Sequence, residues 1–249
     1  MSPTPNESLA ENGPVILTAP AKLTVSLHIT GVRPDGLHTL DAEMVSLSLA
    51  DTIELAPGGD EFVVEGVTGR VGAAADNLVS RALALVGRRA GVRLLKEIPA
   101  GAGLGGGSSD AAAVLRWAGF NDVEAAARLG ADVPFCVAGG RARVRGIGEL
   151  IDPLPFELRR LTLLTPPIGA STPAVYARWD AMGGPVGENG NDLEPAALAE
   201  VPELARYRDV LGDASGQTPR LAGSGSTWFV DGHVAGDGHR WVTTVPAQL

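Results

Sequence analysis

The sequence predicts an α+β fold. Segments in which apolar and polar residues alternate, a pattern typical of half-buried strands, occur in both halves of the chain. Segments with apolar residues at helical spacing lie among them. Two glycine-rich turns, at 99–107 and 223–226, join such segments. Strands and helices mixed in this way indicate the α+β class rather than an all-helical or all-strand fold.

The N-terminal third of the chain is predicted to be mostly strand. From Lys22 to Thr30 polar and apolar residues alternate strictly, so Lys22 and Thr24 share one face and are available to line a cleft. Arg33-Pro-Asp-Gly36 is a turn sequence. The other strands expected in the first hundred residues are 15–18, 38–50, 52–56, 61–65 and 92–98.

Helices are expected in the middle of the chain. Asp76 is placed to cap a helix whose apolar residues share one face. Further helices are expected at 108–118 and 121–129, before a break at 130–134. Strands at 133–138 and 141–146 follow, and 151–155 is expected to be a domain junction.

The second half is predicted to begin with a strand at 161–165. A helix follows, with Thr172 as its cap and Pro173 at its first position. An irregular loop at 183–190 leads to a helical stretch from Asn191 to about Leu211. The last strands are expected at 220–222, 227–230 and 240–244. The predicted organisation is therefore a disordered tail at 1–13, an N-terminal domain at 14–152 and a C-terminal domain at 153–249.

Composition excludes several classes of protein. The formal net charge of −9, with no basic face, argues against nucleic acid as a partner. No apolar run reaches the roughly 18 residues of a membrane span, and the polar segment 1–13 lacks the apolar core of a signal peptide. Cys136 is the single cysteine, so no internal disulfide can form and a reducing, cytoplasmic location is expected. Its apolar neighbours favour a buried structural thiol over a nucleophile.

The most informative segment is the glycine-rich block at 99–113. Five glycines stand between Gly101 and Gly107, and a helix-forming run follows. A glycine-rich loop that opens onto a helix N-terminus presents free N–H groups, which suits phosphate. A flexible linker is the alternative, but the block lies in mid-domain between a strand and a helix. The Walker pattern is excluded, because Ser108 stands where it needs lysine. The dinucleotide fingerprint is matched by three glycines, but the acidic residue expected after a second strand is missing.

Lysine is used in only two places. Of 20 basic residues, only Lys22 and Lys96 are lysine. A compact ammonium differs from the guanidinium fork of arginine, so these two positions are candidates for a specific role. Lys96 lies three residues before the glycine-rich block, and Lys22 begins the strand with a polar face.

These motifs together resemble those of the GHMP small-molecule kinase superfamily, in the same order and over most of residues 15–230. The segments that carry the resemblance are Pro20-Ala-Lys-Leu23, Asp35-Gly-Leu-His38, Asp76-Asn-Leu78, the block 99–113, Gly130-Ala-Asp-Val-Pro134, Asn191-Asp-Leu-Glu-Pro195 and Gly223-Ser-Gly225. The resemblance implies a two-domain fold, with an N-terminal ATP-binding domain like ribosomal protein S5 and a ferredoxin-like C-terminal domain that is trimmed here.

The resemblance also implies the reaction. ATP, with Mg²⁺, would phosphorylate the 2-hydroxyl of 4-diphosphocytidyl-2-C-methyl-D-erythritol, a small-molecule substrate of the non-mevalonate isoprenoid pathway. By similarity, Asp132 is the general base and Lys22 its electrostatic partner. Such a base typically contributes 10²–10⁴-fold to the rate, and a nearby ammonium favours the developing alkoxide.

Binding residues are likewise implied by the resemblance. Thr24, His38, Asp132, Pro173 and Tyr176 are expected to bind the substrate, with His38 reading the cytosine edge. Ser108 is expected to contribute to the Mg²⁺ site. The expected ATP-binding residues are Asn77, Lys96, Pro99, Ala100, Gly101, Ala102, Gly103, Leu104, Gly105, Gly106, Gly107, Ser108 and Ser109.

Three features depart from the pattern of these relatives. Leu37 stands where a tyrosine commonly stacks on cytosine, and Thr24 replaces a frequent asparagine. The segment after Val230 is short and contains two Asp-Gly-His sequences, which indicate turns before they indicate a metal site. The alternatives left open are a kinase for another small alcohol and a non-catalytic nucleotide-binding regulator. The oligomeric state is also left open.

Overall fold

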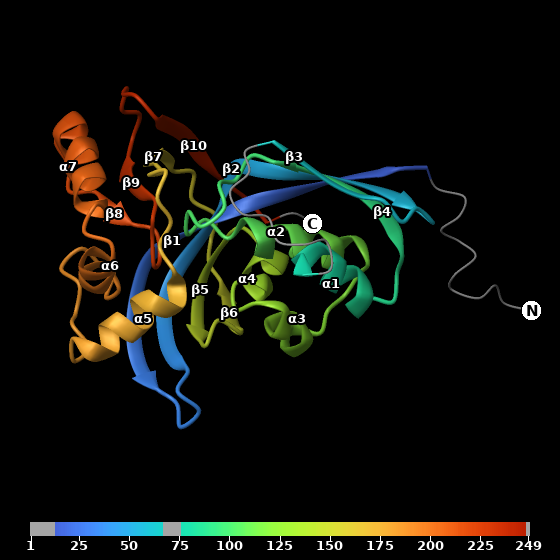
Figure 1. The fold of residues 1–249 in the computed structure, drawn as a ribbon, viewed down its shortest axis with the longest axis horizontal. Helices are drawn as coiled ribbons and strands as arrows, with labels where there is room; N and C mark the ends of the chain where they lie inside the picture. Colours follow the sequence, from blue (N-terminus) through green and yellow to red (C-terminus); the bar gives the residue numbers. More distant parts are fainter. Residues whose placement is uncertain (1–12, 67–75, 248–249) are drawn as a thin grey trace, which may run out of the picture.

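The computed structural model describes residues 13–66 and 76–247, so nearly all of the predicted tail at 1–13 lies outside the described residues. Two long antiparallel strands, β1 (Val15–Val32) and β2 (His38–Pro57), run through the molecule (Figure 1). Each was expected as two shorter strands. β1 continues through Pro20 because the register shifts between Pro20 and Lys22, and such irregular positions accommodate proline.

The remaining strands extend this hairpin into one ten-stranded sheet in the described part of the chain, ordered β3-β4-β2-β10-β7-β9-β8, with β1, β5 and β6 attached through β2. β3 pairs in parallel with β4, and the other pairings given are antiparallel. The bounds are β3 (Phe62–Gly66), β4 (Ala90–Lys96), β5 (Arg141–Gly146), β6 (Leu150–Pro153), β7 (Arg160–Leu164), β8 (Arg220–Leu221), β9 (Trp228–Asp231) and β10 (His239–Val245).

The C-terminal strand joins the two halves. β10 pairs with β2 at Thr244 and Leu47, and with β7 at Trp241 and Thr162. The sheet therefore continues across the predicted division at 152/153, which falls at the end of β6. The domain boundaries themselves stay a prediction.

Seven helices are described, in two groups that Figure 1 separates. α1 to α4 cover the sheet beside β2 and β5, whereas α5 to α7 lie with the C-terminal strands. Their bounds are α1 (Leu78–Leu85), α2 (Gly106–Trp117), α3 (Val123–Leu129), α4 (Val133–Ala138), α5 (Thr172–Ala181), α6 (Glu194–Glu200) and α7 (Leu204–Ser215). No helix in the described ranges is long and apolar enough to cross a membrane.

The strand expected at 133–138 is wrong, because this segment forms α4. Pro134 lies in the first helical turn, where a missing N–H is tolerated. Val133, Phe135 and Cys136 are all buried, and a short apolar run with every side chain buried does not distinguish a strand from a helix. Burial raises the pKa of Cys136 to about 12, with the charge of Asp132 adding to it. The predicted burial of Cys136 is thus confirmed.

Three helix boundaries also differ from expectation. Asn77, not Asp76, caps α1, since its Oδ1 accepts from the N–H of Val79 at 2.9 Å. Ser171 precedes α5, so Thr172 is the first helical residue and Pro173 the second. The helical stretch predicted to begin at Asn191 is divided into α6 and α7 around Pro202, which disfavours helical backbone at the preceding residue.

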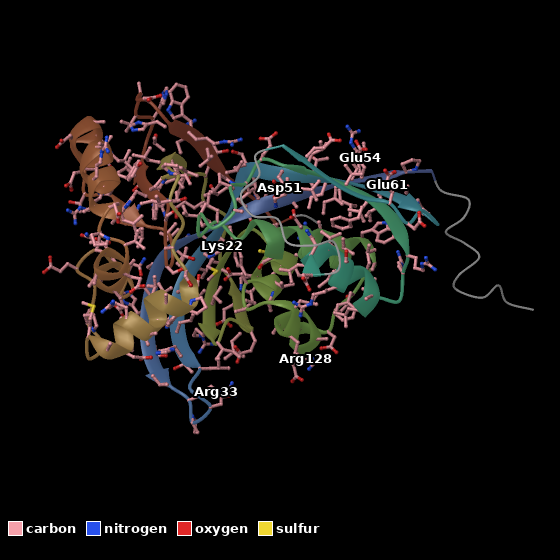
Figure 2. All side chains as sticks on the ribbon, in the orientation of Figure 1. Lys22, Arg33, Asp51, Glu54, Glu61 and Arg128 are labelled. Atoms are coloured by element: carbon pink, nitrogen blue, oxygen red, sulfur yellow. The ribbon has the colours of Figure 1, made fainter. Side chains whose placement is uncertain are left out.

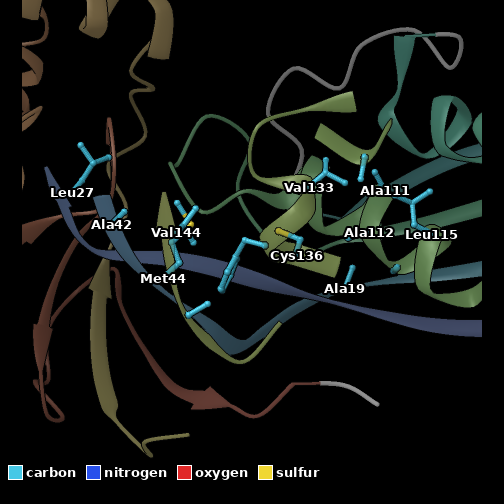
Figure 3. Close-up of a cluster of buried hydrophobic side chains, with 14 of the residues drawn as sticks. Ala19, Leu27, Ala42, Met44, Ala111, Ala112, Leu115, Val133, Cys136 and Val144 are labelled. Carbon is cyan, nitrogen blue, oxygen red and sulfur yellow. The ribbon is translucent and has the colours of Figure 1, made fainter. Parts of the chain in front are cut away.

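Two clusters of buried side chains hold these layers together. The larger one packs α1, α2 and α4 against β1, β2 and β5, and Figure 3 shows part of it around Met44, Cys136 and Leu115. Three consecutive alanines of α2, Ala111 to Ala113, are buried there. The smaller cluster joins Leu23 and Leu47 of the first half to Phe229 of the second. The glycine-rich loop packs into the smaller cluster through Ala102 and Leu104, whereas α2, which follows it, packs into the larger one through Leu115.

Candidate active site

The glycine-rich loop connects the end of β4 to the first residue of α2, and close contacts fix its path. A Cβ on Gly103 would lie 2.6 Å from the carbonyl oxygens of Ala222 and Gly225, and the φ of Gly103 is +76°. A Cβ on Gly105, where φ is +67°, would lie 2.6 Å from Cγ of Lys22. Glycine is required at both positions, because other residues are strained at positive φ and the space is filled. The loop thus contacts the second glycine-rich turn and Lys22 directly.

A cavity of about 360 Å³ lies over this loop. All the residues expected to bind ATP line it, except Ser109. Leu78, Leu94, Ile98 and Asp110 complete its wall. The residue that precedes α2 is Gly105, which has no side chain to cap the helix, so the N–H groups of the first turn and the positive dipole end are available to an anion.

Ser109 does not reach the cavity. Its side chain is buried, and its hydroxyl donates to the carbonyl oxygen of Pro20 and lies 3.6 Å from Sγ of Cys136. Of the residues expected to bind ATP, Ser109 is thus the one whose side chain faces β1 in this structure. Ser109 thus connects the start of α2 to β1. Successive residues of a helix point in different directions, and of the two serines only Ser108 lines the cavity.

Lys96 lies at the wall of this cavity, between two buried carboxylates. Its Nζ donates to Oδ2 of Asp51 and, at 2.7 Å, to Oδ2 of Asp110. Oδ1 of Asp51 accepts from the N–H groups of Glu97 at 2.6 Å and Ile98 at 2.9 Å. These three side chains, the Asp51–Lys96–Asp110 cluster, connect β2, the end of β4 and α2, and so hold both ends of the glycine-rich loop.

Burial and charge oppose each other in this cluster. Burial by itself lowers the pKa of Lys96, but the two carboxylates outweigh it and leave the pKa raised. Burial raises the pKa of Asp110 to about 7, because the attraction of Lys96 is partly cancelled by the charge of Asp51. Oδ1 of Asp110 is buried without a hydrogen-bond partner among the described residues. Burial thus favours the protonated form of Asp110 relative to a free aspartate.

A second, larger cavity of about 720 Å³ contains Lys22 and Asp132. Nζ of Lys22 lies 3.2 Å from Oδ2 of Asp132 and donates to Oγ1 of Thr24 at 3.2 Å. The side chain of Lys22 is 8% exposed and that of Asp132 is 32% exposed, so the cation is enclosed while the carboxylate stays open to the cavity. In Figure 2, Lys22 lies near the middle of the molecule and Arg33 marks the tip of the β1–β2 hairpin. The shared face predicted for Lys22 and Thr24 is confirmed.

Helix α5 and the start of β2 form another part of this cavity. His38, Pro173, Tyr176 and Asp180 line it. Nε2 of His38 lies 2.8 Å from Oδ1 of Asp180, and the rings of His38 and Tyr176 are 4.8 Å apart at their centroids. Burial, with the charge of Asp132, raises the pKa of Tyr176 to about 12, so its phenol stays neutral near pH 7. All five residues expected to bind the substrate thus line one cavity.

The two cavities meet. Gly103, Gly105 and Ser108 line both of them. A group held by the loop in the smaller cavity is therefore adjacent to Lys22 and Asp132 in the larger one. This arrangement brings a phosphate-binding loop to a carboxylate paired with a buried ammonium.

Sequence reasoning missed several residues of the site: Asp51, Asp110 and Asp180. Asp51 gives a signal, since it is a carboxylate in the interior of a predicted strand region, whereas Asp180 lies on a largely exposed helix, where a charged residue is ordinary. Asn191 lies in the segment Asn191-Asp-Leu-Glu-Pro195, which carries part of the family resemblance, and the structure shows what its side chain binds. Its Nδ2 donates to the carbonyl oxygens of Leu221 at 2.9 Å and Gly223 at 2.7 Å, which holds the second glycine-rich turn in place.

Side chains of the Asp-Gly-His segments have partners within the protein. Asp231 pairs with Arg159 at 2.7 Å and with Arg220 at 2.8 Å, and Nδ1 of His239 lies 3.2 Å from the carbonyl oxygen of Val234. Residues 13–66 and 76–247 contain no group of three or more His, Cys, Asp or Glu side chains placed to hold a metal ion.

The fold and the two joined cavities define a kinase of the GHMP class. In agreement, the family model described as "GHMP kinases N terminal domain" matches residues 77–140, from the cap of α1 to two residues beyond α4. This range includes the glycine-rich loop and Asp132.

Full-length relatives identify the family within that class. The 4-diphosphocytidyl-2-C-methyl-D-erythritol kinase of Paracoccus denitrificans is 43% identical over 232 residues, which cover 85% of this chain and 84% of that protein. The enzyme of the same name from Ruegeria pomeroyi is 36% identical over 262 residues, covering 93% and 92%. A crystal structure of 4-(cytidine 5'-diphospho)-2C-methyl-D-erythritol kinase matches with a TM-score of 0.72 at 30% identity, covering 92% of this chain and 99% of that one. The chain belongs to the 4-diphosphocytidyl-2-C-methyl-D-erythritol kinase family.

Proposed function

We propose that this protein transfers the γ-phosphoryl group of ATP to the 2-hydroxyl of 4-diphosphocytidyl-2-C-methyl-D-erythritol, in the methylerythritol phosphate pathway of isoprenoid synthesis. The observation that carries the proposal is the Lys22–Asp132 pair, 3.2 Å apart, beside the glycine loop that both cavities share. The names of the relatives supply the substrate. A cytoplasmic location is part of the proposal and rests on Cys136, a buried single cysteine with no disulfide partner.

ATP is proposed to bind in the smaller cavity. Its phosphates would lie on the N–H groups of the loop and of the first turn of α2, where the helix dipole favours negative charge. Asn77 and Leu78, at the start of α1, line the same cavity and would contact the adenine base of ATP. The Asp51–Lys96–Asp110 cluster would keep the loop in its binding shape.

Phosphoryl transfer would occur where the cavities meet. Asp132 accepts the proton of the 2-hydroxyl, the hydroxyl oxygen bonds to the γ-phosphorus, and the bond from that phosphorus to the β–γ bridging oxygen breaks to release ADP. Lys22 stabilises the negative charge that develops on the attacking oxygen. Thr24 holds the ammonium of Lys22 at its place through the 3.2 Å hydrogen bond.

The residues present fit Mg²⁺ bound together with ATP. Such an ion usually keeps several waters and takes phosphate oxygens and only one or two protein ligands. The hydroxyl of Ser108, at the boundary of the two cavities, would be one such ligand. Bound there, the ion would neutralise phosphate charge during transfer.

A different small alcohol as the substrate is favoured by one residue, Leu37. This side chain lines the larger cavity but is 48% exposed and offers no aromatic face to a base. Tyr176 supplies such a face from α5, which supports the cytidine-bearing substrate instead.

The test is ADP release from the purified chain with ATP and Mg²⁺, comparing the diphosphocytidyl substrate with homoserine, mevalonate and free 2-C-methylerythritol. We expect turnover with the diphosphocytidyl compound and at least about 100-fold less with the other alcohols, because they leave polar groups of the cavity unpaired. Equal or better turnover of another alcohol would reject the proposed substrate. ATP binding without turnover of any of them would indicate a nucleotide-binding regulator.

A further inference from the structure

His38 and Asp180 form a pair that connects two distant parts of the chain. His38 is the first residue of β2, and Asp180 lies in the last turn of α5, 142 positions later. Nε2 of His38 and Oδ1 of Asp180 are 2.8 Å apart. The side chain of His38 is 10% exposed, whereas that of Asp180 is 51% exposed. Both residues line the larger cavity.

This contact determines which nitrogen of the imidazole carries the proton. An ionised carboxylate only accepts hydrogen bonds, so Nε2 of His38 must be the donor. In the neutral ring, Nδ1 is then left with a lone pair and acts as an acceptor. Among the described residues, no side chain or backbone group forms a hydrogen bond with Nδ1 of His38.

The ring of His38 is also held in a fixed orientation. Tyr176 lies against it at a centroid distance of 4.8 Å and an interplanar angle of 40°. Trp179 meets it edge-on, at 5.5 Å and 85°, and the Nε1–H of Trp179 donates to the carbonyl oxygen of Pro185 at 2.9 Å. One helix, α5, therefore supplies both ring contacts and the carboxylate.

His38 and Tyr176 are the aromatic rings that line the larger cavity, among the residues that the structure describes. The proposed substrate has one planar group, its cytosine, and an aromatic face stacks on such a group. With the reacting hydroxyl at Lys22 and Asp132, the cytosine end of the substrate is placed at these rings. This step rests on the proposed function.

We propose that Asp180 is a positioning residue that makes Nδ1 of His38 an acceptor for the 4-amino group of cytosine. Uracil carries a carbonyl oxygen at the same position. In the same pose, that oxygen would face the lone pair of Nδ1, with no proton between two acceptors. A site built to hydrogen-bond an N–H group discriminates strongly against an analogue without it. Asp180 thus sets the preference of the enzyme for cytosine over uracil.

The test compares kcat/KM for the diphosphocytidyl substrate and its diphosphouridyl analogue in the wild type and in Asp180→Ala. We expect the wild type to prefer cytosine by about 100-fold and Asp180→Ala by less than about 10-fold, with the loss mainly in KM for the cytidyl compound. The matched control is Asp209→Ala, since Asp209 on α7 is 61% exposed and lines neither cavity. The control should keep the wild-type ratio. A ratio in Asp180→Ala within twofold of the wild type overturns the proposal.

The wild-type arm separates this proposal from the proposed function. Turnover of the cytidyl substrate by the wild type supports the function whatever Asp180→Ala does, and turnover of neither substrate rejects both. A second readout is independent of activity: ¹⁵N NMR of the imidazoles, with the signal of His38 assigned among four histidines through His38→Gln. We expect a protonated Nε2 and a bare Nδ1 in the wild type, and a change of this pattern in Asp180→Ala. A proton on Nδ1 and none on Nε2 in the wild type overturns the proposal.

Discussion

At the scale of single residues, the site depends on Lys22 reaching Asp132 through a narrow space. The side chain of Lys22 passes against Gly105 on its way to the carboxylate, 3.2 Å away. Thr24 takes one of its three N–H donors. A change that leaves both charged groups in place but moves the lysine should therefore impair catalysis.

Gly105→Ala makes such a change. The new Cβ would overlap Cγ of Lys22 at 2.6 Å, so we expect kcat to fall about 100-fold or more, as when a catalytic group is displaced by an ångström. Gly87→Ala is the matched control. Gly87 has nearly the same φ, +66°, with nothing within 4 Å, so it carries only the backbone strain of about 1–2 kcal/mol. Steady-state kinetics and urea unfolding of both variants separate the two effects. Equal kcat in the two variants would refute the contact.

At the scale of elements, the Asp51–Lys96–Asp110 cluster holds the two ends of the glycine-rich loop in position. Two N–H groups at the end of β4 bind one carboxylate, and the ammonium connects that carboxylate to α2. Residues on three elements are thus tied together where the loop begins and ends. Because the cluster holds two carboxylates and one ammonium, its stability contribution depends on pH.

The sign of that dependence follows from Asp110. The pKa of this carboxyl is raised from 3.8 to about 7 in the folded state, so the folded chain binds a proton more tightly than the unfolded chain. Between these two pH values, stability from this group decreases as pH rises, and the decrease ends above about pH 7. We expect Asp110→Asn to lack this contribution. Urea unfolding from pH 4.5 to 8 measures it, and an unchanged slope of unfolding free energy against pH in the variant would contradict the assignment.

Many of these helices, strands and loops could be predicted from the sequence, because glycine, proline and the alternation of apolar and polar residues are local signals. The loop at 99–107, the cap region of α1 and the strand bearing Lys22 and Thr24 all follow from such signals. The helix at Val133–Ala138 could not be predicted, since four apolar residues in a row, Val133 to Cys136, are buried, and such a run shows neither a helical nor a strand period. Nor could Ser109 be distinguished from Ser108, because which of two neighbouring hydroxyls faces the loop depends on how α2 packs on β1.

At the scale of the whole molecule, the site is completed by residues from both halves of the chain. Asn191 is one connection at the site: it bridges to Leu27 of β1 and binds the carbonyl oxygens of Leu221 and Gly223. The second glycine-rich turn then lies against Gly103. The pairing of Asp180 with His38 is of the same kind, and a contact between residues 142 positions apart has no local signal in the sequence.

Asn191→Ala tests this connection. The substitution leaves two carbonyl oxygens without their donor in a buried position, so we expect the free energy of unfolding to fall by about 2–4 kcal/mol. Asn189→Ala is the control from the same segment, with one 3.3 Å hydrogen bond to Glu194 and an expected loss under about 1 kcal/mol. Guanidinium unfolding measures both. Equal losses would show that Asn191 does not hold the halves together.

The central claim, that Asp132 is the general base of a kinase whose two cavities meet at the glycine loop, is tested most directly by Asp132→Asn. The measurement is single-turnover ADP formation with saturating ATP and diphosphocytidyl substrate, with Asp209→Asn as the control. We predict a 10²–10⁴-fold slower turnover in Asp132→Asn, with both substrates still bound, and no change in the control. A folded Asp132→Asn enzyme that turns over within about threefold of the wild type would contradict the claim.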